Sequence, residues 1–262
     1  MKHIVVWSGG CDSTLILLDL IKKGVDVEVL VFDTNTFGIG KQKYEENARC
    51  DILKTIDKKI HINKISLDFS IDNILGNGPR LFQQPCMIAL TTIFGQNDSI
   101  FYFGYHKGDD FFTESHNILS GSDWLLISLG NKNIKFSFPL RYMTKDIIIG
   151  KLESLGMLDL CHWCEYPDDA IDNSGRCGKC TPCKTYSDSL DLLKKHRRNN
   201  TYNDINLEYE YANLFNIDGW RDAKDLVLED IRKTADTDIC ERHNKSKLIK
   251  NKKHHKKLTN KK

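Results

Sequence analysis

The sequence predicts an α/β protein built on a doubly wound, parallel, five-stranded sheet. Three observations lead to this prediction. Short apolar segments alternate with helical patterns over the first 158 residues, a Ser-Gly-Gly turn directly follows the first apolar segment, and five cysteines gather between Cys161 and Cys183. Strands that alternate with helices favour parallel pairing. With 262 residues, of which 40% are hydrophobic, the chain is long enough for one such domain and a smaller appendage.

The expected elements follow in chain order. Strands are predicted at Ile4–Trp7, Val25–Asp33, Lys59–Ile65, Ser99–Gly104 and Ile134–Phe138. Helices are predicted from Ser13 to Ile21, at Lys41–Ile56, at Gln83–Gly95 with Pro85 in the first turn, and at Lys145–Leu155, which Gly156 ends. Ligands of such sheets bind beyond the carboxyl ends of the strands. Residues 8–13, Asp33 and residues 105–110 are therefore expected along one edge.

The turn after the first strand has the composition of a phosphate-binding loop. Gly9 and Gly10 allow a tight turn that brings backbone N–H groups close to an anion. The helix that follows adds unpaired donors and the positive end of its dipole. Side chains add hydroxyl groups at Ser8, Ser13 and Thr14 and, at Asp12, a carboxylate suited to Mg²⁺. An ordinary glycine-containing turn between a strand and a helix is the alternative interpretation.

The cysteine spacing Cys161-x2-Cys164-x12-Cys177-x2-Cys180-x2-Cys183 predicts a metal site. A Cys-x2-Cys unit places two thiolates within reach of a tetrahedral Zn²⁺, at about 2.3 Å per sulfur. Five cysteines compete for four positions, and we favour Cys177, Cys180 and Cys183 with Cys164 rather than Cys161 as the fourth ligand. Four thiolates close a zinc site, so its expected role is structural. An iron–sulfur cluster fits the same spacing, and His162 is expected at the surface rather than among the ligands.

Composition restricts location and partners. The N-terminus lacks the form of a signal peptide, and no segment has the apolar length of a membrane span, so we expect a cytoplasmic protein with reduced cysteines and no membrane partner. The net charge is +2, but the segment from Lys245 to the end contains no acidic residue. This tail is read as a solvated, disordered end, with a non-specific nucleic-acid arm as the alternative.

Residues 8–13, SGGCDS, resemble the PP-loop of the ATP pyrophosphatase superfamily. Its members cleave ATP between the α- and β-phosphates and pass AMP to a substrate oxygen. Together with PLRYMTKDII (139–148) and CGKCTPC (177–183), this loop resembles one branch, the 7-cyano-7-deazaguanine synthase family of queuosine biosynthesis. The resemblance covers roughly residues 3 to 190. It implies a fold of the adenine nucleotide alpha hydrolase type.

The resemblance also implies a reaction and a set of site residues. A ligase of this family converts 7-carboxy-7-deazaguanine, ammonia and two ATP into the nitrile, with Mg²⁺ and Zn²⁺ as metals, and a homodimer is suggested. Asp12 and Lys145 would be catalytic, although Lys145 also fits an exposed lysine in a first helical turn. The remaining implied positions are the ATP-binding residues Ser8, Gly9, Gly10, Asp12, Ser13, Thr14 and Asp33, and the substrate-binding residues Arg80, Asp109 and Asp110.

The chain departs from the family pattern in the loops expected to bind the purine and ammonia. A Tyr-Gly-Gln after the second strand is absent, and Pro79 and Arg80 stand in altered spacing. These departures keep other acceptors open: an amine on a protein or nucleic acid, or a tRNA. A non-catalytic zinc scaffold is a further alternative. The expected organisation is an ATP-binding domain at 1–158, a zinc motif and helix at 159–198, a helical extension at 199–244 and the basic tail at 245–262.

Overall fold

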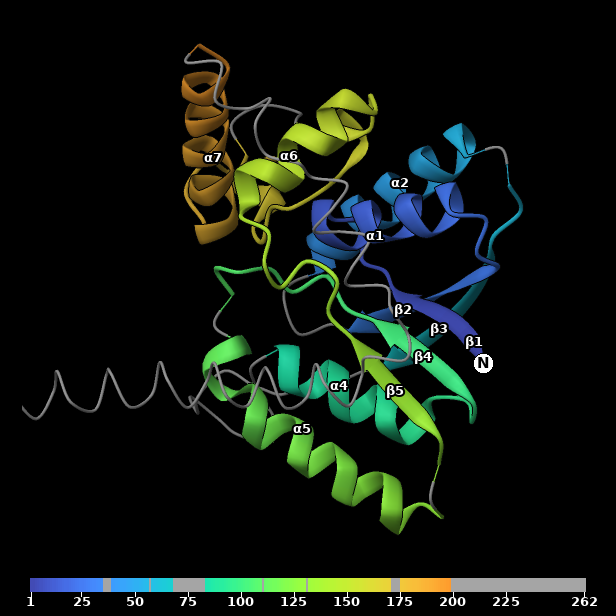
Figure 1. The fold of residues 1–262 in the computed structure, drawn as a ribbon. Coiled ribbons are helices and arrows are strands. Elements are labelled where there is room, and N and C mark those ends of the chain that lie inside the picture. The colour runs from blue at the N-terminus through green and yellow to red at the C-terminus, as the bar shows by residue number, and fades with distance from the viewer. Residues whose placement is uncertain are drawn as a thin grey trace, which may run out of the picture. The chain divides into compact units, whose positions relative to one another are not determined.

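The computed structural model describes residues 1–34, 39–56, 58–67, 83–109, 111–130, 132–170 and 175–198, all within one compact unit that comprises residues 1–211. They form an α/β structure around a five-stranded sheet (Figure 1). The strand order is β3-β2-β1-β4-β5, and every neighbouring pair is parallel. The predicted doubly wound, five-stranded α/β fold is confirmed.

The elements have the following bounds. The strands are β1 (Lys2–Val6), β2 (Val27–Thr34), β3 (His61–Leu67), β4 (Ser99–Tyr102) and β5 (Ile134–Ser137). The helices are α1 (Cys11–Lys22), α2 (Ile39–Thr55), α4 (Gln83–Phe94), α5 (Phe111–Ser128), α6 (Lys145–Ser154) and α7 (Thr181–Arg198), with short 3₁₀ turns at Leu158–Leu160 and Pro167–Asp169. None of these described helices is long and apolar enough to cross a membrane.

Helices cover both faces of the sheet. Figure 1 shows α1 and α2 on one face and α4 and α5 on the other, with α6 and α7 on the side of α1. The central strand β1 ends in the apolar residues Ile4, Val5 and Val6, which suits a strand whose two faces are both covered by helices. Val5 is fully buried there, and Trp7, directly after the strand, is 1% exposed.

The strand order creates a topological switch point beside β1. After β1 the chain passes through α1 to β2, whereas the other neighbour of β1 is β4, which comes much later in the sequence. Connections therefore leave the two adjacent strands toward opposite faces, and a crevice opens beyond their carboxyl ends. Trp7, Ser8 and Gly10 after β1 border this crevice, as do most residues from Phe103 to Asp109 after β4.

The predicted elements agree with the structure apart from shifts of a few residues at their ends and one omission. Helix α5 occupies a region for which no helix was predicted. Pro85 lies in the first turn of α4, as expected. Two predicted substrate residues, Arg80 and Asp110, lie outside the described residues, as do the predicted extension and tail from residue 199 onward.

Candidate active site

The loop after β1 is anchored to the sheet through Trp7. The backbone N–H of Trp7 donates to the Leu30 carbonyl of β2 (2.8 Å), which extends the sheet pairing by one residue. The indole Nε1 of Trp7 donates to Thr14 Oγ1 (3.1 Å) inside the core. Thr14 is fully buried, and its side chain does not line the crevice. The Thr14 hydroxyl therefore supports the loop from beneath.

The loop leaves the first donors of α1 facing the crevice. Gly9 has φ +88°, a conformation that favours glycine. Gly10 is the N-cap of α1, and no side chain of the described residues caps this end of the helix. The hydroxyls of Ser8 and Ser13 lie 3.4 Å apart, and the Ser13 hydroxyl accepts the backbone N–H of Ser8 (3.3 Å). Two hydroxyls and the positive end of a helix thus meet at one place, which suits an anion.

A cavity of about 520 Å³ lies above this loop. One part of its wall comes from the loop and the start of α1, including Ser8, Gly10 and Ser13. Other parts of the wall come from α2, from the segment after β4, from the start of α6, and from the segment around the cysteines with the start of α7. The cavity therefore lies at the switch point of the sheet, where ligands of doubly wound folds bind.

Asp12 and Lys145 form an ion pair in the wall of this cavity. Lys145 Nζ lies 2.7 and 2.6 Å from the two carboxylate oxygens of Asp12, and the Lys145 side chain is 13% exposed. Burial alone would lower the pKa of Lys145, but the Asp12 carboxylate outweighs that effect and raises it. This pairing favours the protonated form of Lys145, which lies at the first position of α6, next to the start of α1. The structure brings these two sequence-predicted residues together.

The segment after β4 closes tightly over the start of α1. A Cβ atom on Gly104 would lie 2.8 Å from the backbone nitrogen of Ser13 and 2.9 Å from Asp12 Cβ. Beyond it, Asp109 Oδ2 accepts the backbone N–H of His106 (2.6 Å). Burial raises the pKa of Asp109, and the nearby Asp12 adds to this shift. Asp109, a predicted substrate residue, lines the cavity.

Helix α2 supplies a wall that the sequence analysis did not anticipate. Lys41 and Glu45, one turn apart, line the cavity, with 3.6 Å between Lys41 Nζ and Glu45 Oε1. Burial raises the pKa of Glu45, against the opposing effect of Lys41 and Arg49. Arg49, one turn further, donates from Nη1 to the carbonyl of Ser8 (2.9 Å). The sequence showed that Arg49 belongs to the helix predicted at Lys41–Ile56. It did not show that the face of this helix carrying Arg49 packs against the loop after β1.

Asp33, predicted to bind the nucleotide, is not among the residues that line the cavity, although its neighbour Phe32 is. Its carboxylate, at the end of β2, forms an ion pair with Lys64 of β3 (2.6 Å). Of the predicted ATP-binding residues, Ser8, Gly10, Asp12 and Ser13 line the cavity. Gly9 instead faces α2, because a Cβ there would lie 3.0 Å from Arg49 Cγ and from the Glu45 carbonyl oxygen.

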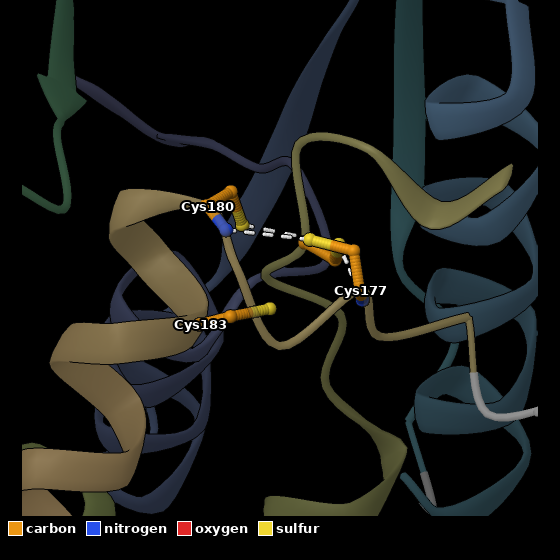
Figure 2. A group of neighbouring side chains, drawn as sticks. Cys177, Cys180 and Cys183 are labelled. Carbon is orange, nitrogen blue, oxygen red and sulfur yellow. Dashed lines mark hydrogen bonds between the residues drawn. The ribbon is translucent and has the colours of Figure 1, made fainter. Parts of the chain in front are cut away.

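The four cysteines that we favoured as ligands come together. The Sγ atoms of Cys164, Cys177, Cys180 and Cys183 all lie within 4.8 Å of one another, and all four residues are buried. Figure 2 shows Cys183, from the first turn of α7, pointing toward Cys177 and Cys180 of the preceding loop. Backbone N–H groups of Lys179 and Cys180 donate to the sulfur of Cys177 and lower its pKa to about 7. Trp163 packs against the cluster.

The geometry of this cluster fits a tetrahedral metal ion. Sulfurs bound to Zn²⁺ at about 2.3 Å would lie about 3.8 Å apart, and Cys164 Sγ and Cys180 Sγ are 3.9 Å apart. The donor set also suits an iron–sulfur cluster, so sulfur ligation alone does not select the metal. A metal held by these four thiolates has no open position for substrate.

Cys161 and His162 lie outside this cluster. The Cys161 thiol is hydrogen bonded to the Met157 carbonyl (3.4 Å) and to Cys11, an interaction that lowers the pKa of Cys11. The expected surface position of His162 is wrong, because this residue is 7% exposed. Its ring stacks on Tyr44, its Nε2 bonds to the Cys164 carbonyl (3.1 Å), and burial lowers its pKa to about 4. The neutral ring fills the space between α2 and the cysteine cluster.

Comparisons with known proteins yield likenesses of structure. No family model and no curated protein matches the chain. A predicted subunit of tRNA methyltransferase from Methanocaldococcus jannaschii shares 19% identity over 58% of this chain and 74% of its own, with a TM-score of 0.41. The U34-tRNA thiolase NcsA from Methanococcus maripaludis, solved with its [4Fe-4S] cluster, shares 19% identity over 76% of this chain and 66% of its own (TM-score 0.39). NMN synthetase from Francisella tularensis shares 15% identity over 74% and 77% (TM-score 0.42). Likenesses of this size carry no conclusion about substrate or reaction.

Proposed function

We propose that this protein is an ATP-dependent enzyme that cleaves ATP between the α- and β-phosphates and transfers AMP to a substrate oxygen. The observation that carries the proposal is the Asp12–Lys145 pair, held at the start of α1 beside the Ser8–Ser13 loop, in a cavity at the switch point. A cation, a carboxylate and the backbone donors at the start of α1 converge there. The SGGCDS resemblance to the PP-loop supports the same assignment.

Each group has a role in that reaction. Ser8, Ser13 and the first N–H groups of α1 would hold the departing pyrophosphate, whose negative charge grows as the bond to the α-phosphate breaks. Asp12 would bind the Mg²⁺ that accompanies the phosphates, and this ion would neutralise part of their charge. Lys145, which pairs with Asp12 in the structure, would supply a positive charge to the phosphate oxygens, and Asp12 would supply a carboxylate ligand for the metal.

For the acceptor we propose the carboxylate of 7-carboxy-7-deazaguanine. The carboxylate oxygen attacks the α-phosphorus and pyrophosphate leaves; ammonia then attacks the acyl carbon, and AMP and a proton leave to give the amide. A second ATP activates the amide oxygen in the same way, and loss of AMP and a proton yields the nitrile. Support comes from the family resemblance of residues 139–148 and 177–183. In this scheme Asp109 lies on the substrate side, and the four-cysteine cluster holds structural zinc.

A second candidate function keeps the adenylation of the carboxylate but replaces ammonia in the second step. The activated acyl group is then transferred to an amine on a protein or a nucleic acid, including a tRNA. The departures from the family pattern in the sequence segments 32–47 and 78–85 motivate it, as does the acid-free tail from Lys245. Clustered lysines attract phosphate backbones without reading their sequence. In this case the chemistry at Asp12 and Lys145 is unchanged, and the difference lies in the second half-reaction.

One experiment separates these functions. The purified protein is incubated with Mg-ATP, 7-carboxy-7-deazaguanine and ammonium, and AMP, amide and nitrile are followed by mass spectrometry. Free nitrile supports the ligase, and an acyl-adenylate that waits for another amine supports the second candidate. Asp12→Ala should abolish AMP release while the metal content stays unchanged. Absence of AMP with every carboxylate tested would refute both functions.

A further inference from the structure

We propose that residues 8–10, here called the phosphate loop, are held in place by two contacts from other elements. These positioning contacts, from the Arg49 side chain and the backbone N–H of His162, turn the peptide N–H groups of the loop toward the phosphate. The proposal deepens the function above and rests on it for the identity of the anion. It concerns two consecutive peptide units, Ser8–Gly9 and Gly9–Gly10. Glycine peptides rotate more freely than any others, so an outside contact is needed to fix their direction.

The first contact comes from α2. Arg49 Nη1 donates to the Ser8 carbonyl (2.9 Å), and the Arg49 side chain is 11% exposed. The helix lies directly against the loop, because a Cβ on Gly9 would lie 3.0 Å from Arg49 Cγ. A trans peptide is planar, with its C=O and N–H on opposite sides. With the Ser8 carbonyl held toward α2, the Gly9 N–H points away from it, and it donates to no backbone carbonyl of the residues with described positions.

The second contact comes from the segment that carries the cysteines. The His162 N–H donates to the Gly9 carbonyl (3.1 Å), so the Gly10 N–H points to the other side of that peptide. There it donates to Ser8 Oγ (3.1 Å), a hydroxyl in the wall of the cavity. The His162 ring in turn bonds to the carbonyl of Cys164, a member of the four-cysteine cluster. The segment that carries the cysteine cluster therefore positions His162, and His162 in turn holds the Gly9 carbonyl of the loop.

The two contacts share one electrostatic consequence. Both hold a carbonyl oxygen on the outer side of the loop, where it cannot repel a phosphate. If the Ser8–Gly9 peptide turned over, a carbonyl oxygen would replace the Gly9 N–H on the inner side of the loop. If the Gly9–Gly10 peptide turned over, Ser8 Oγ would lose the Gly10 N–H and face a carbonyl oxygen instead. Donors that are oriented before the ligand arrives need no reorganisation when it binds. We therefore expect Arg49 and the cysteine cluster to control the affinity of the loop without touching the nucleotide.

The first arm of the test removes the α2 contact. Arg49→Met keeps an unbranched side chain of similar length without a donor, Arg49→Lys keeps a charged donor, and Lys54→Met serves as a control at a site on the same helix that is 74% exposed. Mg-ATP affinity is measured by calorimetry, and backbone hydrogen exchange is followed over residues 7–14 without nucleotide. We expect Arg49→Met to weaken Mg-ATP binding about ten- to hundredfold and to speed exchange. Arg49→Lys should recover part of both losses, and Lys54→Met should match the wild type.

The second arm removes the metal. Chelation, or Cys183→Ser, should speed hydrogen exchange over residues 7–14 and weaken Mg-ATP binding, with the metal content measured in parallel. Unchanged exchange after both perturbations would overturn the proposal, as would an Arg49→Lys variant no better than Arg49→Met. The exchange readout needs no nucleotide. Both perturbations could speed exchange while the wild-type protein fails to bind Mg-ATP. That result would refute the proposed function and leave the positioning contacts supported.

Discussion

Replacing Gly104 by alanine tests the closest approach in the candidate site. The new Cβ would lie 2.8 Å from Ser13 N, 2.9 Å from Asp12 Cβ and 3.0 Å from the Asp12 carbonyl carbon. These neighbours belong to the backbone or sit directly on it, so no flexible side chain can move aside. The segment after β4 and the start of α1 must therefore separate.

The size of the effect follows from these distances. Ordinary contacts begin near 3.4 to 3.5 Å, so the two segments must separate by about 0.6 Å. Overpacking of this kind costs about 1 to 3 kcal/mol, which corresponds to a fall in Tm of about 3 to 10 °C for a domain of this size. Since a displacement of about 1 Å at reacting groups costs about 100-fold in rate, we expect kcat/KM for AMP formation to fall at least about tenfold.

Differential scanning calorimetry and an AMP-release assay measure the two effects. Gly121→Ala is the matched control: this exposed glycine lies within α5, and a Cβ there would meet no atom within 4 Å. That change should raise stability by about 0.5 to 1 kcal/mol, because alanine favours a helix. If Gly104→Ala leaves both Tm and AMP release at wild-type values, the close approach of the two segments is wrong. If Gly104→Ala lowers Tm but leaves AMP release unchanged, the contact contributes to stability but not to the reaction.

Three further changes test other parts of the site. Lys145→Met should lower AMP formation at least about 100-fold, because its ammonium, 2.6 Å from Asp12, no longer neutralises phosphate charge; unchanged pyrophosphate release would exclude this role. Cys164→Ser should abolish metal binding in elemental analysis, whereas Cys161→Ser should retain it, since Cys161 lies outside the cluster; the reverse result would make Cys161 the fourth ligand. Burial raises the pKa of Asp109, so its ionised form costs stability at neutral pH, and the contribution of this group rises as the pH falls toward its ordinary pKa of 3.8. Asp109→Asn should therefore raise Tm at neutral pH, and thermal scans should show a smaller increase in Tm as the pH falls. A lower Tm of this variant at neutral pH would contradict the expected cost of the ionised carboxylate.

Local pattern was sufficient to predict most of the fold. The apolar segment at residues 4–7 is short and follows a charged terminus, and Gly9 and Gly10 end it, so strand, turn and helix are all encoded within about twenty residues. Helix α5 was missed because its apolar residues do not follow a clear helical repeat. Two of them, Trp124 and Ile127, are 68% and 64% exposed. The pattern of apolar residues therefore does not separate a buried face from an exposed face in this helix, and the sequence gives no clear signal for it.

The site divides in the same way. Asp12 was predictable because it belongs to the loop motif, and Lys145 because it begins a helix after the last strand. Arg49, Gly104 and His162 were not predictable, because their importance comes from what they meet in space. Nothing local distinguishes Gly104 from a glycine at any strand end; only the presence of Ser13 N against it makes the absence of a side chain necessary.

The loop of residues 7–10 lies near the start of the sequence, yet the residues that contact it from other elements come much later. The Asp12–Lys145 contact spans 133 residues, and the His162 contact reaches further still. Contacts of such separation close large loops and form late in folding. A chain that ends near residue 158 could contain every strand of the sheet and still lack the His162 contact. We therefore expect nucleotide affinity to report completion of the fold, and bound nucleotide to protect the junction between the sheet and the cysteine cluster against unfolding.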